Sequence, residues 1–172
     1  MPAINFTQIH QTDFAAIQRL AYDIWHEHYP GIISYRQIDY MLDQQYSQDS
    51  MNRDLASNVT MVKLNVDETL AGFATFGRDK SDQSRAVKLH KLYLLQSFHG
   101  RGLGSMLLNH VESESMDQGF ERIKLSVNKH NRSAVNTYRR NGYRIEQSVL
   151  ENIGSGFFVD DYIMVKKLLP NS

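Results

Sequence analysis

The chain has no cysteine among its 172 residues, which excludes disulfide bonds, thiolate metal sites and a cysteine nucleophile. It also has no net charge, because 19 lysines and arginines balance 19 aspartates and glutamates. A protein whose main partner is nucleic acid or an anionic membrane surface needs a clear basic excess. We therefore expect neither nucleic acid nor a membrane among its partners.

Long apolar runs are missing as well. No apolar segment approaches the roughly 18 residues that a membrane-spanning helix requires. The opening residues, MPAINFTQIHQTDF, lack the basic start and apolar run of a secretory signal. The sequence therefore predicts a soluble, cytoplasmic protein. Its histidines show no metal-ligand spacing with carboxylates, so no metal site is predicted.

Proline is scarce, and its three positions, Pro2, Pro30 and Pro170, leave the long middle of the chain without a proline breaker. The sequence shows no internal repeat and no low-complexity linker. A chain of 172 residues suits one domain with a sizeable core. We expect a single domain that spans residues 1–172.

Hydrophobic periodicity predicts the order of the elements. After a short strand at 3–10, a helix capped by Thr12 should end at Pro30-Gly31, and a second helix should begin behind Ser34. Further strands are predicted at 59–66, 69–77, 86–95, 122–128, 143–150 and 157–167, the first two of them as an antiparallel hairpin. Helices should follow Leu103 and Asn131. This order indicates an α+β or mixed α/β fold.

The stretch HGRGLGSMLL, from His99 to Leu108, places three glycines at alternate positions before an apolar helical pattern. Glycine lets a backbone approach a ligand closely, and a helix N-terminus directs unpaired N–H groups outward, so this loop could bind phosphate. A Walker A loop needs lysine after its last glycine, and the dinucleotide fingerprint needs a third glycine where Ser105 stands. ATP and NAD are therefore poorly supported, and a simple tight turn remains an alternative.

A family resemblance covers this loop. The segment KLYLLQSFHGRGLGSMLL resembles the acyl-CoA-binding segment of the GNAT superfamily of N-acyltransferases, with His99 where that family usually has Gln or Arg. The segment from Asn131 to Tyr143 resembles the family pattern N-x-x-A-x-x-x-Y-x-x-x-G-F, with Tyr143 in place of Phe. More loosely, both ends of the chain resemble bacterial polyamine-acetyltransferase-like members.

The resemblance implies a central, mixed, mostly antiparallel sheet flanked by helices, in which a splayed strand pair holds acetyl-CoA. It implies that the following residues bind this co-substrate: Leu94, Leu95, His99, Gly100, Arg101, Gly102, Leu103, Gly104, Ser105, Asn131 and Ala134. A backbone N–H near Leu94 would stabilise the oxyanion. Since no cysteine is available, direct transfer in a ternary complex is favoured over a covalent acyl-thiol enzyme.

Two side chains are candidates for proton transfer. Tyr138 matches the motif tyrosine, and as general acid it would hydrogen-bond the leaving thiolate, because a phenol with a pKa of about 10 cannot fully protonate a thiolate of about 8.5. Its helical spacing with Ala134 and Val135 also fits a core aromatic. His90, on the strand that leads to the loop, is the candidate base. A structural histidine, with a water chain to solvent as base, is the alternative.

Aromatic and acidic side chains are frequent between Ala21 and Tyr46, a combination that suits a cationic amine. The candidate acceptor-binding residues there are Trp25, Tyr29, Tyr35, Asp39 and Tyr40. We expect a small polyamine or a similar primary amine as acceptor. A peptide or protein N-terminus or lysine, ordinary solvated helix faces, and a non-catalytic acyl-CoA sensor remain alternatives. A homodimer is left open.

Overall fold

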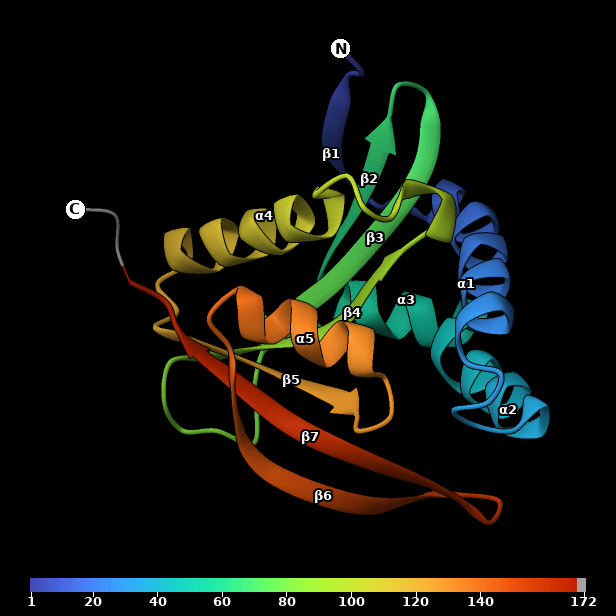
Figure 1. The fold of residues 1–172 in the computed structure, drawn as a ribbon. Helices are drawn as coiled ribbons and strands as arrows, with labels where there is room; N and C mark the ends of the chain where they lie inside the picture. The colour runs from blue at the N-terminus through green and yellow to red at the C-terminus, as the bar shows by residue number, and fades with distance from the viewer. Residues whose placement is uncertain (170–172) are drawn as a thin grey trace. The chain divides into compact units, whose positions relative to one another are not determined.

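The computed structural model describes residues 1–169 (Figure 1). Helices and strands alternate along the chain in a mixed order. The helices are α1 (Phe14–His28), α2 (Tyr35–Tyr46), α3 (Gln48–Ala56), α4 (Leu103–Asp117) and α5 (Arg132–Arg140). The strands are β1 (Ile4–Gln8), β2 (Thr60–Val66), β3 (Thr69–Arg78), β4 (Ala86–Leu94), β5 (Arg122–Asn128), β6 (Arg144–Gly154) and β7 (Phe157–Lys167).

The seven strands follow the order β1-β2-β3-β4-β5-β7-β6. Strands β4 and β5 are parallel, whereas β1 with β2, β2 with β3, β5 with β7 and β6 with β7 are antiparallel. The sheet is therefore mixed and mostly antiparallel, as predicted. A sheet with these four antiparallel pairs is not a doubly wound fold, since that fold has a mostly parallel sheet.

The described chain divides into two compact units. The first unit contains Met1–Gly77 and Lys91–Leu108. Its core lies between α1, α2, α3 and strands β2 and β3, and its largest fully buried side chains include Trp25 and Phe73. Helix α1 buries residues at helical spacing, such as Ile17 and Ile24, so its apolar stripe faces this core.

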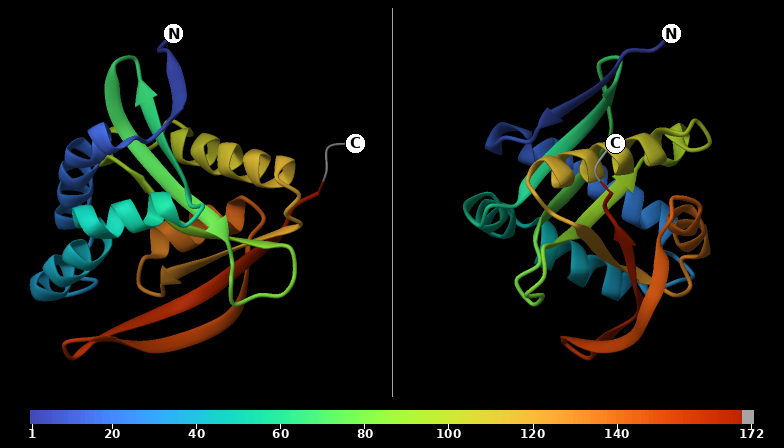
Figure 2. Two further views of the ribbon diagram at one scale, coloured as in Figure 1. Left: turned by 180° about the vertical axis from the view of Figure 1, so that it is seen from behind. Right: turned by 90° about the vertical axis from the view of Figure 1, so that its left-hand side faces the viewer.

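The second unit contains Arg78–His90 and the chain from Asn109 onward. Strands β6 and β7 form a long twisted hairpin whose far end projects as a two-stranded ribbon (Figure 2). Because β7 also pairs with β5, the later strand lies inside and β6 lies at the edge. Strand β5 alternates buried residues, Ile123, Leu125 and Val127, with more accessible ones, as expected for a sheet covered on one face.

Most predicted elements are confirmed, and the caps explain why. The Ser34 side chain accepts the Gln37 N–H at the start of α2, and the Asn131 side chain accepts the Ala134 N–H at the start of α5. Strands β5 and β7 have the predicted bounds. Hydroxyl and amide side chains at helix starts are thus readable from sequence.

Two predictions of local structure were wrong, and one helix was missed. Thr12 does not cap the first helix, because it lies inside a short 3-10 turn, Gln11–Asp13, that precedes α1. Helix α3 was not predicted, and it buries only Met51. Strand β6 continues to Gly154, past the predicted end, because its pairing with β7 extends to Phe157.

No helix within residues 1–169 is long and apolar enough to cross a bilayer.

Candidate functional site

The glycine loop of the first unit connects β4 to α4. Gly100 and Gly102 have φ of 78° and 74°, a left-handed conformation that side chains other than glycine adopt at a cost. A Cβ placed on Gly100, Gly102 or Gly104 would meet no atom within 4 Å, so open space borders this backbone. The first α4 hydrogen bond runs from Met106 N–H to the Gly102 carbonyl oxygen, which leaves earlier N–H groups of the helix outside its own ladder. This geometry fits a pyrophosphate.

Two side chains of the loop are held by neighbouring residues. The His99 Nε2 lies 2.9 Å from the Leu94 carbonyl oxygen, so this histidine ties the loop to the end of β4. The Arg101 guanidinium lies over the Phe98 ring, 5.3 Å from its centre. The cation therefore stays beside the glycines, where it adds positive charge to the candidate phosphate site.

The end of β4 is anchored to β3 within the first unit. The Leu95 N–H donates to the Ala71 carbonyl oxygen at 2.8 Å. Alternate residues of a strand direct their backbone polar groups to the same side, so the Leu94 N–H points away from β3. In the second unit, the parallel register of β4 with β5 runs from Ala86 with Arg122 to Leu89 with Leu125, whereas β4 itself continues to Leu94.

An aromatic cluster in the first unit includes two of the predicted acceptor residues, Trp25 and Tyr29. Trp25 is 1% exposed, and its ring centre lies 4.7 Å from that of Tyr29 and 5.6 Å from that of Tyr93. The Tyr29 and Tyr93 hydroxyl oxygens are 3.4 Å apart. Trp25 therefore supports Tyr29 from within the core. Tyr93, on β4, was not singled out from the sequence, because its pairing with Tyr29 spans 64 residues.

The remaining acceptor candidates lie on α2. Tyr35 is exposed, Tyr40 is partly buried, and the Asp39 side chain is 67% exposed. One Asp39 oxygen lies 3.1 Å from Nε2 of His26 on α1. The carboxylate thus joins α1 to α2 and still presents its other oxygen to solvent. Such a surface can attract a cation.

Lys91 is a second residue of the first unit that sequence reasoning missed. It is only 7% exposed, its Nζ donates to the Gln45 carbonyl oxygen at 2.8 Å, and it lies 3.6 Å from Asp54 Oδ2. Burial lowers the pKa of this amine, while the nearby Asp54 opposes that shift. Lys91 therefore fixes β4 against the end of α2 and against α3.

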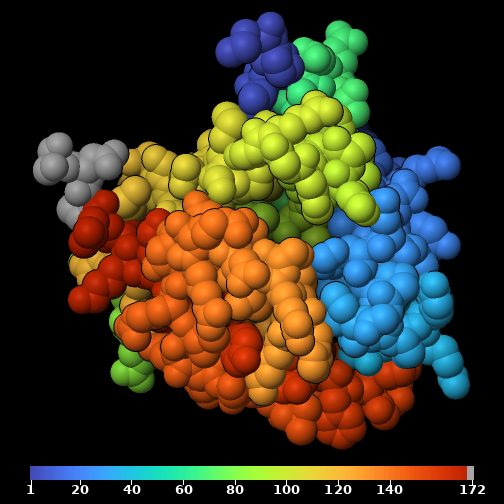
Figure 3. All heavy atoms as spheres, viewed as in Figure 1, coloured from blue at the N-terminus to red at the C-terminus, as the bar shows by residue number. Residues whose placement is uncertain are grey.

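In the second unit, α5 carries the motif residues. Asn131 is buried, and its Oδ1 caps the helix at Ala134 N, 3.4 Å away. Tyr138 is partly buried, and its ring packs edge-on against Tyr143 with 5.6 Å between ring centres. The outer face of α5 lies on the molecular surface in the space-filling view (Figure 3). Tyr138 thus stands between a solvated helix face and a buried aromatic ring.

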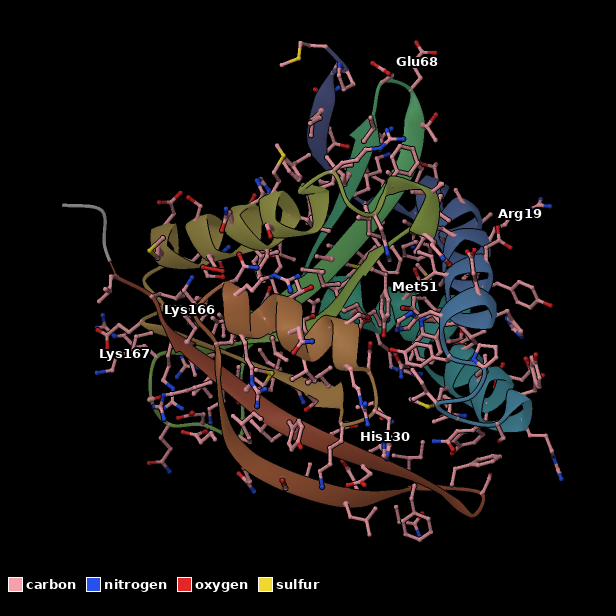
Figure 4. All side chains as sticks on the ribbon, viewed as in Figure 1. Arg19, Met51, Glu68, His130, Lys166 and Lys167 are labelled. Atoms are coloured by element: carbon pink, nitrogen blue, oxygen red, sulfur yellow. The ribbon has the colours of Figure 1, made fainter. Side chains whose placement is uncertain are left out.

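A buried polar network lies next to Tyr138. The Tyr143 hydroxyl donates to Glu112 Oε2 at 3.2 Å, and Lys166 Nζ donates to Glu112 Oε1 at 2.5 Å. Glu112 is 6% exposed, and Tyr143 is 3% exposed. Burial, together with the Glu112 charge, raises the pKa of Tyr143 far above its ordinary value, so this phenol stays protonated. The only sequence signal was tyrosine where the family pattern has phenylalanine. Figure 4 labels Lys166 on β7.

His90 occupies an exposed position on β4, directly after buried Leu89, in the second unit. The candidate residues therefore divide between the units: Leu94 to Ser105 and the acceptor set belong to the first, and His90, Asn131, Ala134 and Tyr138 to the second. Their assigned roles stay predictions. Within residues 1–169, no group of three or more His, Asp or Glu side chains could hold a metal ion.

Comparison with known proteins agrees with this geometry. Residues 16–143 match the Acetyltransferase (GNAT) family. An uncharacterised N-acetyltransferase of Mycobacterium bovis is 33% identical over 103 residues, which are 60% of this chain and 64% of that protein. This chain therefore matches a little under two thirds of that relative's length. A spermidine N(1)-acetyltransferase of Thermoplasma acidophilum is 26% identical over 96% of this chain and 98% of its own.

Solved structures show the same fold. The PaiA N-acetyltransferase of Thermoplasma acidophilum, solved with coenzyme A, superposes with a TM-score of 0.79 at 24% identity over 96% of this chain and 99% of its own. The ribosomal-protein-S18-alanine N-acetyltransferase of Escherichia coli superposes with a TM-score of 0.72 at 15% identity over 99% and 97%.

The family match spans both the glycine loop and helix α5. The chain belongs to the Acetyltransferase (GNAT) family, as its two motifs predicted.

Proposed function

We propose that this protein transfers an acetyl group from acetyl-CoA to the primary amine of a small polyamine. The observation that carries the proposal is the glycine loop, whose positive-φ glycines border open space at the start of α4. Acetyl-CoA supplies an activated acetyl thioester. The loop backbone and the Arg101 cation would hold its pyrophosphate, which is anionic and favours a helix N-terminus.

The transfer itself needs two proton movements. The amine nitrogen attacks the thioester carbonyl carbon, a C–N bond forms, and the C–S bond breaks. The Leu94 N–H would stabilise the negative charge that develops on the carbonyl oxygen. Tyr138 would donate its proton toward the departing sulfur, and the amine would lose a proton to His90 or to a water chain. The products are the N-acetylated amine and the free thiol of CoA.

Two features support a polyamine as the acceptor. The spermidine N(1)-acetyltransferase relative aligns over nearly the full length of both chains. Helix α2 presents the exposed carboxylate of Asp39 with Tyr35 and Tyr40 on the same helix, and a carboxylate with aromatic faces attracts alkylammonium groups. A cytoplasmic location and a homodimer stay predictions.

The test of the reaction is turnover with a panel of amines. Purified protein is mixed with acetyl-CoA and spermidine, putrescine, amino acids or short peptides, and thiol release and product masses are recorded. We expect acetylated spermidine or putrescine from the wild type. Tyr138→Phe should lower kcat by about 100-fold with acetyl-CoA affinity retained, because general-acid assistance contributes about that much.

Tyr162→Phe is the matched control, since it removes another hydroxyl of the second unit and should keep wild-type kcat. Equal kcat in Tyr138→Phe and the wild type would remove Tyr138 from catalysis. Replacing Asp39 with Ala should raise the KM for the polyamine, with kcat unchanged, because a carboxylate that only attracts the substrate contributes binding. An unchanged KM would remove Asp39 from the acceptor site.

A further inference from the structure

Strand β3 carries an extra residue opposite β2. Leu64 pairs with Gly72, but the next residue, Asn65, pairs with Leu70, so Ala71 has no opposing residue on β2. This is a β-bulge, which bends a strand and redirects its backbone groups. The Ala71 carbonyl oxygen accepts the Leu95 N–H at 2.8 Å. The bulged residue of β3 therefore holds Leu95, the residue that follows β4.

Gly72, the residue after the bulge, lies unusually close to β4. A Cβ at this position would be 2.5 Å from the Tyr93 carbonyl oxygen, 3.1 Å from Leu94 Cδ1 and 3.3 Å from Leu94 Cα. Two of these atoms belong to the backbone and cannot rotate away. Any side chain at residue 72 must therefore displace β4 at Tyr93 and Leu94.

The displaced backbone is the part of β4 proposed to act on the acetyl group. The Tyr93 carbonyl and the Leu95 N–H face β3, so the Leu94 N–H between them points to the opposite side. We infer that Gly72 is a positioning residue, whose missing side chain lets β4 lie close to β3 and thereby sets the position of the Leu94 N–H. This inference rests on the proposed acetyl transfer.

Gly77 provides a matched control in the same strand. A Cβ at Gly77 would lie 3.4 Å from the Asn58 carbonyl oxygen and 3.5 Å from Val59 Cα, which are ordinary contact distances. Gly77→Ala therefore adds the same methyl group to the same strand without moving β4. Both glycines are buried residues of β3. Each substitution by alanine restricts the unfolded backbone to a similar extent.

The experiment compares wild type, Gly72→Ala and Gly77→Ala by kcat with saturating acetyl-CoA and amine, and by Kd for free CoA from calorimetry. We expect Gly72→Ala to lower kcat by about 100-fold, since a misplaced oxyanion donor costs about that much. Its Kd for CoA should rise far less than kcat falls, by about fivefold at most, because the glycines of the loop keep their sequence and only the His99–Leu94 link to β4 is strained. Gly77→Ala should match the wild type in both.

A general loss of structure would raise the Kd for CoA together with the loss of kcat, and that result would overturn the positioning role. Wild-type kcat in Gly72→Ala would also overturn it while leaving the proposed function in place. Absence of turnover in the wild type with every amine would instead refute the proposed function, and the inference with it.

A second pair of variants decides the question if Gly72→Ala does not fold. Leu95 has φ −55° and ψ 138°, which proline adopts readily, so Leu95→Pro removes the N–H that bonds Ala71 without forcing a new backbone conformation on residue 95. Leu95→Ala removes the same side chain and keeps that N–H, so it accounts for any loss of CoA contacts that both variants share. Leu95→Pro should have a kcat well below that of Leu95→Ala at a similar Kd for CoA, and equal kcat values in the two variants would overturn the inference.

Discussion

At the scale of single residues, Asp161 on β7 has a shifted pKa that makes the stability of the fold depend on pH. Burial, with the neighbouring carboxylates of Asp160 and Glu151, raises its pKa from 3.8 to about 6, and Lys129 and Lys88 offset only part of this effect. The folded protein therefore holds the Asp161 proton more tightly than the unfolded chain does. Its ionisation destabilises the fold, and this destabilisation builds up as the pH rises from 3.8 to 6.

Asp161→Asn should therefore raise the Tm by a few degrees at about pH 7.5, where the wild-type carboxylate is ionised in both states. The gain should shrink as the pH falls from about 6 to about 4, since both wild-type states then become protonated. Differential scanning calorimetry across this range measures the effect. Glu68→Gln, at the exposed β2–β3 turn (Figure 4), is the control and should give no gain. A pH-independent gain would contradict the role of Asp161 ionisation.

Local residue roles were predictable, and long-range ones were not. The caps Ser34 and Asn131 act on N–H groups three residues away, so the sequence alone reveals them. Glu112 meets Lys166 across 54 residues, and no local pattern records such a pair. The burial of Trp25 was equally hidden, because an aromatic residue on an amphipathic helix can face the core or a ligand.

At the scale of elements, the buried Glu112 network joins α4 to β7 and to Tyr143, the residue before β6. Glu112→Ala would leave the Lys166 ammonium and the Tyr143 hydroxyl without their shared carboxylate, so we expect a loss of about 3 kcal/mol in the free energy of unfolding. Tyr143→Phe should lose only about 1 kcal/mol, since Lys166 keeps Glu112 paired. Urea unfolding followed by circular dichroism measures both.

Glu114→Ala is the control for this prediction. Glu114 lies on the same helix, partly exposed, with an oxygen 3.0 Å from His110 Nε2, and an ion pair of this kind stabilises by about 0.5 kcal/mol or less. Equal losses in Glu112→Ala and Glu114→Ala would show that the buried network does not join these elements.

Elements with strong periodicity were predicted closely, and weakly patterned ones were not. Strand β5 reads as alternating buried and accessible residues, and its predicted bounds agree with the structure. Helix α3, with the sequence QDSMNRDLA, buries only Met51 and so has almost no apolar stripe to detect. Its start depends on the Ser47 side chain, which accepts the Ser50 N–H. Packing, rather than pattern, decides such short helices.

At the scale of the whole molecule, two short motifs were enough to predict the family and the sheet type. The strand order was beyond their reach, because β7 lies between β5 and β6 although it follows β6 in the chain. Such an order depends on which edges pair in the folded state, and periodicity describes each strand only by itself. The acetyl acceptor stays a proposal, and the residues proposed to recognise it lie on or next to two separate helices, α1 and α2.

Binding of acetyl-CoA should stabilise the whole molecule by mass action. At about 100 times its Kd, the ligand should add about 2.7 kcal/mol to the free energy of unfolding. For a chain of this size the Tm should then rise by about 5–10 °C, which thermal unfolding with and without acetyl-CoA measures.

Gly102→Ala should lose most of this rise, because alanine is strained at a φ of 74° and its methyl group would enter the open space at the loop. Gly119→Ala is the matched control: its φ is 88° and its methyl group also meets nothing within 4 Å, but it lies after α4. Both variants should lower the Tm of the free protein to a similar extent, so a difference confined to the ligand-induced rise identifies the loop as the acetyl-CoA site, and equal rises would exclude it.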